Sequence, residues 1–177
     1  MTKAAFHLAG ALTFAALILP SAAQAATATQ CMTKPELRGM VAYMMPSVVD
    51  SIIEKCKATL PADSFVATRA PELSRELAKG QPAAWPMAKR AFMKFGGDDD
   101  KGAAAMLEAM PEAAMRPLVE NVLTQEFSGM IKTKDCKDVD AVLGTLVPLP
   151  AISFVDLFTE VLIIGARGDK ELTICEA

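Results

Sequence analysis

The segment between the first two cysteines, residues 31–56, most constrains how this chain can fold, because it has the pattern of one long helix. Thr33 and Glu36 stand three residues apart, the spacing of a capping box, in which two side chains bind backbone N–H groups left free at a helix start. Pro35 falls in the first turn, where its missing N–H costs nothing. Apolar residues then recur at steps of three and four, at Leu37, Met40, Val41, Met44, Val48 and Ile52.

Pro46 lies inside this predicted helix. At about 100° per residue it falls roughly opposite Leu37, so we expect it on the polar side. A proline there bends a helix without disturbing its buried face. No loop residues separate the two halves, so they can form a corner but not a hairpin.

The length of this helix restricts the disulfides. About 23 residues at 1.5 Å each place Cys31 and Cys56 roughly 35 Å apart, or about 25 Å at a right-angled corner. A disulfide needs Cα atoms within about 7 Å, which excludes a Cys31–Cys56 bond. We predict the nested pairs Cys31–Cys175 and Cys56–Cys136 over the crossed pairs, because nesting joins the two chain ends, as is common in compact domains.

The first 25 residues have the pattern of a signal peptide, with Lys3, an apolar run, Pro20 and the small-x-small sequence Ala23-Gln24-Ala25. The apolar run is too short to span a bilayer comfortably. We therefore expect a mature helical domain of residues 26–177 that is exported to the periplasm or secreted, and that is not an integral membrane protein after cleavage. Four cysteines without a C-x-x-C pair then indicate two structural disulfides.

The rest of the chain predicts a single-domain all-α bundle of about six to eight short to medium helices. Prolines and glycines bound helices at residues 71–79 and 83–95, an alanine-rich helix through Met106 and Leu107, and helices at 117–131, 139–147 and 153–166. Ser153 and Asp156 have the spacing of a capping box for the last helix. That helix is apolar nearly all round, which is typical of a helix at the centre of a bundle. Residues 171–175, if extended, return Cys175 to the first helix.

Histidine is absent from the predicted mature chain, since the one histidine, His7, lies in the signal peptide. This excludes Ser-His-Asp and Cys-His mechanisms, H-E-x-x-H metalloenzymes and C-x-x-C-H haem attachment. Asp98, Asp99 and Asp100 lack the alternating spacing of a calcium loop. We expect neither a metal nor a cofactor.

An enzyme is therefore less favoured than a protein without catalytic activity. A carboxylate-dependent envelope enzyme acting on cell-wall sugars remains an alternative, because such chemistry needs only two carboxyl groups. The sequence does not single out such a pair. Four candidates are better explained as solvated helix residues: Glu36, Asp50, Glu120 and Glu126.

Charge distribution supports the first functional hypothesis, a non-catalytic envelope protein that binds a macromolecular partner or an anionic surface. The mature chain has 17 basic and 21 acidic residues once Lys3 is removed, yet residues 66–97 contain six bases and two acids. Such a basic surface is suited to anionic lipid or polysaccharide. The acidity of the chain and the lack of a matching motif argue against nucleic acid. The six bases are Arg69, Arg75, Lys79, Lys89, Arg90 and Lys94.

The alternative hypothesis is a carrier of a lipid or another small apolar ligand. The methionine-rich first helix and the apolar 153–166 helix would line its pocket, with Met40, Met44, Phe158 and Leu162 as candidate residues. Thioethers also suit Cu(I), but methionine at helical spacing is what core packing produces. A filled core would favour partner binding, and a cavity would favour the carrier.

Overall fold

The computed structural model describes residues 31–95, 109–146, 148–167 and 173–175. The predicted signal peptide, Asp98–Asp100 and the alanine-rich segment through Leu107 lie outside these residues. Within them the chain forms an all-α bundle of seven α-helices with two disulfides, as the sequence predicts. The elements are α1 (Lys34–Cys56), α2 (Phe65–Thr68), α3 (Ala70–Ala78), α4 (Gln81–Phe95), α6 (Glu112–Met130), the short 3₁₀ turn η1 (Thr133–Asp135), α7 (Cys136–Leu146) and α8 (Ala151–Gly165).

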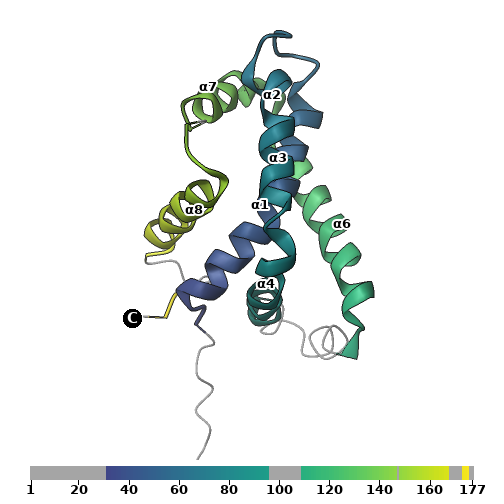
Figure 1. Cartoon of the computed structure of the whole chain (residues 1–177), viewed down its shortest axis with the longest axis vertical. Helices are drawn as coiled ribbons and strands as arrows, with labels where there is room; N and C mark the ends of the chain where they lie inside the picture. The colour runs from purple at the N-terminus through teal and green to yellow at the C-terminus, as the bar shows by residue number, and fades with distance from the viewer. Residues whose placement is uncertain (1–30, 96–108, 147, 168–172, 176–177) are drawn as a thin grey trace, which may run out of the picture.

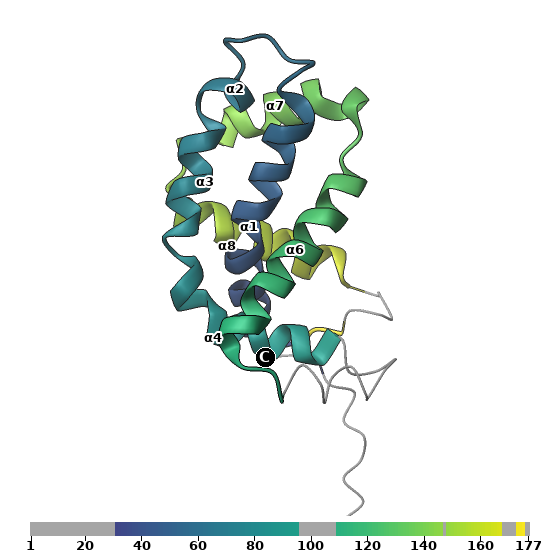
Figure 2. The same ribbon diagram turned by 90° about the vertical axis from the view of Figure 1, so that its right-hand side faces the viewer.

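Helix α1 lies at the centre of the bundle (Figures 1 and 2), where it contacts α3, α4, α6 and α8. Its predicted capping box is confirmed: the Thr33 N–H donates to Glu36 Oε2 at 2.8 Å, and the Glu36 N–H donates to Thr33 Oγ1 at 3.4 Å. Both bonds satisfy groups that the first turn leaves without helical partners. Local sequence signals therefore fix where the central helix begins.

The prediction that Pro46 faces the polar side of α1 is wrong, because Pro46 is buried. Tyr43, Met45 and Val49 are buried as well, although they lie off the predicted apolar stripe. Helices pack around α1 from several directions, so it buries much more than one face. The axis of α1 changes direction midway along its length (Figure 1), as expected of a helix with an interior proline.

The two disulfides join the ends of α1 to distant parts of the chain, in the predicted nested arrangement. Cys31 pairs with Cys175 and Cys56 with Cys136, with Cα–Cα distances of 4.9 and 5.5 Å. Next to the first disulfide, the Met32 N–H donates to the Thr173 carbonyl at 2.8 Å and the Cys175 N–H donates to the Met32 carbonyl at 2.9 Å. The end of the chain therefore returns to the start of α1 in an extended conformation.

Several helices begin earlier than predicted, and α6 and α8 show why. Helix α6 begins at Glu112, so Pro117 lies in its second turn rather than at its start. The first turn carries Met115, which is 3% exposed, and its burial stabilises these extra residues. Helix α8 begins at Ala151, so Ser153 is not its cap, and Asp156 instead accepts a hydrogen bond from Arg38 Nε at 2.6 Å. In both helices, tertiary contacts override a local start signal.

The expectation that the last helix lies at the centre of the bundle is also wrong. Helix α8 buries Phe154, Val155 and Thr159 against its neighbours. It nevertheless leaves five large apolar side chains between 39% and 60% exposed: Ile152, Leu157, Val161, Leu162 and Ile164. Because the disulfides at Cys136 and Cys175 fasten the chain on both sides of α8 to α1, this helix has to lie alongside α1, which already occupies the centre.

Small residues allow α1 and α4 to approach closely. Gly39 of α1 faces Ala84, Met87 and Ala88 of α4. A Cβ atom at position 39 would overlap Met87 Cβ and lie 3.1 Å from the backbone nitrogen of Ala88. Both atoms are fixed by the α4 backbone, so the helices would have to move apart.

We therefore predict that Gly39→Ala destabilises the protein by about 1–3 kcal/mol, as other overpacked cores are destabilised. Gly129→Ala is the matched control, because a Cβ at that helical position meets nothing within 4 Å. Alanine is the better helix former, so this control should be neutral or slightly stabilising. Urea unfolding followed by circular dichroism measures both changes. Equal stability of the two variants would contradict the close packing.

The disulfides generate a second prediction. Cys56–Cys136 closes a loop with a sequence separation of 80 residues and Cys31–Cys175 one of 144, so the chain-entropy model allows each roughly 4 kcal/mol of stabilisation. Reduction with dithiothreitol should lower the melting temperature sharply. A melting curve that is unchanged by complete reduction, with thiol release verified by mass, would show that the disulfides do not stabilise the fold.

Candidate functional site

An apolar groove of about 560 Å³ runs along α1 and is the candidate functional site. Its floor extends from Val41 to Ile52, which is roughly 16 Å along the helix. Helices α7 and α8 supply most of its walls, and Phe127 of α6 closes part of one side. The lining residues are Val41, Met44, Met45, Val48, Val49, Ile52, Phe127, Asp135, Asp138, Val139, Val142, Leu143, Phe154, Phe158 and Leu162.

The two polar lining residues, Asp135 and Asp138, mark one end of the groove. They flank Cys136, whose disulfide to Cys56 holds this end against the C-terminal turn of α1. The neighbouring Lys134 and Lys137 are exposed and do not line the groove. Among the residues that the structure describes, neither carboxylate has a basic group within ion-pair distance. The groove is thus apolar along its length and negatively charged at one end.

Three of the four residues predicted for an apolar pocket line this groove: Met44, Phe158 and Leu162. Met40 does not, because it is 8% exposed and belongs to the packed core beside it. Sequence reasoning missed the contribution of α7, which supplies Asp138, Val139, Val142 and Leu143. The Cys56–Cys136 pairing was the available signal, since it places the start of α7 next to α1.

Apolar side chains at the edge of the groove remain in contact with water. Val142 is 56% exposed and Leu162 is 41% exposed, although both line the groove. Exposed apolar surface is unfavourable in water, and where it is contiguous it commonly marks an interaction site.

Two further hollows have more polar surroundings. One, of about 490 Å³, lies between α1, α3, α4 and α8, and its lining includes Arg38 and Glu76. The other, of about 360 Å³, lies beside α2, α3 and the start of α8, and its lining includes Arg69, Glu72 and Glu76. The exposed surface of both hollows is more polar than that of the groove on α1, so neither is as suited to an apolar ligand.

Three of the six bases of the predicted anionic-partner surface lie on α3 or at its two ends, and the other three lie on α4. Four of them have carboxylate partners: Arg69 pairs with Glu72, Lys79 with Glu76, and both Arg90 and Lys94 with Glu36. Arg75 is exposed and Lys89 is half-buried. Three carboxylates, Glu72, Glu76 and Glu36, therefore offset half of the six positive charges within the fold. Binding of an anionic surface here stays a prediction.

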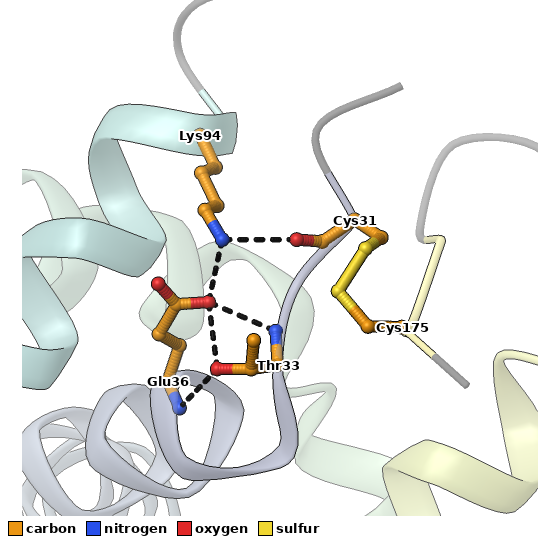
Figure 3. The surroundings of a disulfide bond; sticks show 5 residues. All are labelled: Cys31, Thr33, Glu36, Lys94 and Cys175. Carbon is orange, nitrogen blue, oxygen red and sulfur yellow. Dashed lines mark hydrogen bonds and ion pairs between the residues drawn. A yellow bond between two sulfur atoms is a disulfide. The ribbon is translucent and has the colours of Figure 1, made fainter. Parts of the chain in front are cut away.

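Glu36 lies in a network at the start of α1, beside the Cys31–Cys175 disulfide (Figure 3). Lys94 Nζ donates to Glu36 Oε2 at 2.6 Å and to the carbonyl of Cys31 at 2.9 Å. Glu36 is 7% exposed, so the expectation that it is a solvated residue is wrong. Burial raises the pKa of Glu36, but the hydrogen bonds from Lys94 and Thr33 outweigh it and lower the pKa to about 2.

These contacts give Glu36 a structural role. A general acid near neutral pH needs a raised pKa, whereas the pKa of Glu36 is lowered. Glu120 accepts a hydrogen bond from the Tyr43 hydroxyl at 2.9 Å, and Asp50 accepts one from Ser74 Oγ at 2.6 Å. Both therefore help to join helices rather than only facing solvent, and Glu126 is exposed as expected. A carboxylate enzyme stays an untested alternative.

Within the described ranges, no helix is both long enough and apolar enough to cross a bilayer. Comparison of the chain with protein-family models, with curated protein sequences and with solved structures finds no match.

The Glu36 network generates a prediction about acid stability. The pKa of Glu36 is about 2 in the folded protein and 4.5 in the unfolded chain, so the ionised carboxylate stabilises the fold at pH values above 4.5. This contribution is lost as the pH falls from 4.5 toward 2. We expect Glu36→Gln to cost about 1–3 kcal/mol at pH 7, because Lys94 loses its carboxylate. The variant should also show a weaker loss of stability between pH 5 and pH 2.

Glu54→Gln is the control, because Glu54 is an exposed glutamate of the same helix. Urea unfolding at several pH values measures both variants. If Glu36→Gln and Glu54→Gln behave alike across this range, the network does not contribute to stability.

Proposed function

We propose that the protein is an exported, non-catalytic carrier that binds an apolar small molecule, such as a lipid chain, in the groove on α1. The observation that carries this proposal is the groove itself: a hollow of about 560 Å³ whose lining is apolar except for Asp135 and Asp138. Ligand sites of this kind are usually concave, largely apolar and between about 300 and 1,000 Å³ in volume.

The composition of the groove suits such a ligand. Met44 and Met45 lie on its floor, and the flexible thioether side chain adapts to apolar molecules of different shapes. Phe127, Phe154 and Phe158 supply large apolar surfaces from two other helices. A bound chain would remove the exposed parts of Val142 and Leu162 from water, which is the driving force that the hydrophobic effect provides.

Export is part of the proposal. Two structural disulfides are typical of proteins that fold in an oxidising compartment, and the sequence of residues 1–25 has the pattern of a signal peptide. A protein that carries an apolar ligand through an aqueous compartment needs a surface that shields the ligand from water, and the groove would provide it.

The carrier hypothesis has more support than the binding of an envelope partner through the basic residues. Four of those six bases are paired with carboxylates, whereas a bound ligand would cover the apolar edge of the groove. Binding to a macromolecular partner stays the alternative. Charge reversal at Arg75 and Lys89 would test it without disturbing the Glu36 network.

Titration with the neutral fluorophore N-phenyl-naphthylamine tests the carrier. We expect saturable binding, and we expect Leu162→Gln to weaken it by at least about fivefold, because Leu162 lines the groove and loses apolar contact area. Leu118→Gln is the matched control, since Leu118 is 44% exposed against 41% for Leu162 but lies outside the groove.

Native mass spectrometry of the freshly purified exported protein should in addition detect a bound apolar molecule. Two results would refute the carrier: the absence of saturable fluorophore binding by the wild-type protein, or equal weakening by the Leu162 and Leu118 substitutions.

A further inference from the structure

We propose that the ligand of the α1 groove is an amphiphile with a cationic head group, such as an alkylamine, and not a fatty acid. This inference rests on the proposed carrier function and names the chemistry of its ligand. The observation behind it is charge complementarity: the groove is apolar along α1, and its two polar lining residues are both carboxylates.

The position of the two carboxylates separates the groove into two parts. Asp135 and Asp138 lie at the end held by the Cys56–Cys136 disulfide, while Phe158 and Leu162 of α8 line the groove together with the apolar floor on α1. An amphiphile that lies along the groove can therefore place its chain against the apolar residues and its head group beside the two acids. The length of the floor, roughly 16 Å, suits a medium-length alkyl chain.

The charges that line the groove favour a cation over an anion. Among the residues that the structure describes, no lysine or arginine lines the groove, and no basic group forms an ion pair with Asp135 or Asp138. An ammonium group would supply the missing positive charge and could donate hydrogen bonds to both carboxylates. A fatty-acid carboxylate at this position would be repelled by both side chains. The chain as a whole is also acidic, with a formal net charge of −3.

The partial exposure of these acids limits the size of the effect but does not change its direction. Asp135 is half-buried and Asp138 is exposed, so water and salt screen their interaction with a ligand. Exposed ion pairs contribute up to about 1 kcal/mol each. We therefore expect a head-group preference of roughly threefold to tenfold at low salt, which decreases as salt is added.

Competition against bound N-phenyl-naphthylamine measures this preference at pH 7, with dodecylamine, dodecanol and dodecanoate below their aggregation concentrations. The three competitors share an alkyl chain and carry a positive, a neutral and a negative head group. We expect dodecylamine to displace the fluorophore at the lowest concentration, and dodecanoate at the highest.

The double substitution Asp135→Asn and Asp138→Asn should remove this order while leaving displacement by dodecanol within about twofold. Asp63→Asn is the control, because Asp63 is exposed in the α1–α2 connection and does not line the groove. It changes the net charge of the protein but should keep the order of the three competitors. Fluorophore binding by the double variant shows directly that its groove is still formed.

The outcomes separate this inference from the carrier function. If the fluorophore does not bind the wild-type protein, the carrier itself is refuted. If it binds but the three competitors are equally effective, or if the order survives the double substitution, the groove binds apolar molecules without the proposed selectivity. A preference for dodecanoate over dodecylamine would overturn the inference, because the groove would then select the opposite charge.

Discussion

The structure depends on the length and rigidity of α1. A helix of 23 residues separates Cys31 from Cys56 so far that their sulfur atoms cannot meet, so each cysteine has to pair with a distant part of the chain. Cys136 and Cys175 meet this requirement at opposite ends of α1. The described helices between these two cysteines, α7 and α8, are consequently tethered to the central helix from both sides.

The features that the sequence predicted are those set by local signals or by covalent geometry. Thr33 and Glu36 form the expected capping box because its bonds connect atoms only three residues apart. The Cys31–Cys56 pair could be excluded because helical rise and Cα–Cα limits are fixed by bond geometry. The nested pairs were preferred over the crossed ones because they bring the chain ends together. Met44, Phe158 and Leu162 could be named from the sequence because each lies among apolar residues at helical spacing, in a methionine-rich helix or in one that is apolar nearly all round.

The features that the sequence did not predict are decided by packing between distant residues. Pro46 is buried because several helices surround α1, which the periodicity of α1 alone does not show. Ser153 and Asp156 have the spacing of a cap, but Asp156 is engaged by Arg38 from a helix more than 100 residues earlier. The acidic end of the groove was missed although the predicted Cys56–Cys136 pairing brings Asp135 of η1 and Asp138 of α7 close to α1.

The two disulfides influence where α8 lies, and α8 in turn forms one wall of the groove. Its apolar residues would be better shielded from water at the centre of the bundle, yet Leu162 and Ile164 are 41% and 60% exposed. An arrangement that leaves apolar surface in water loses hydrophobic stabilisation, and disulfides compensate for this because they restrict the unfolded chain rather than add contacts to the folded one. Cross-links at both ends of α1 can therefore keep the walls of the groove in place without filling it. A carrier needs both an unfilled apolar groove and cross-links that hold its walls, because a fold that was stable through packing alone would leave no space for a ligand.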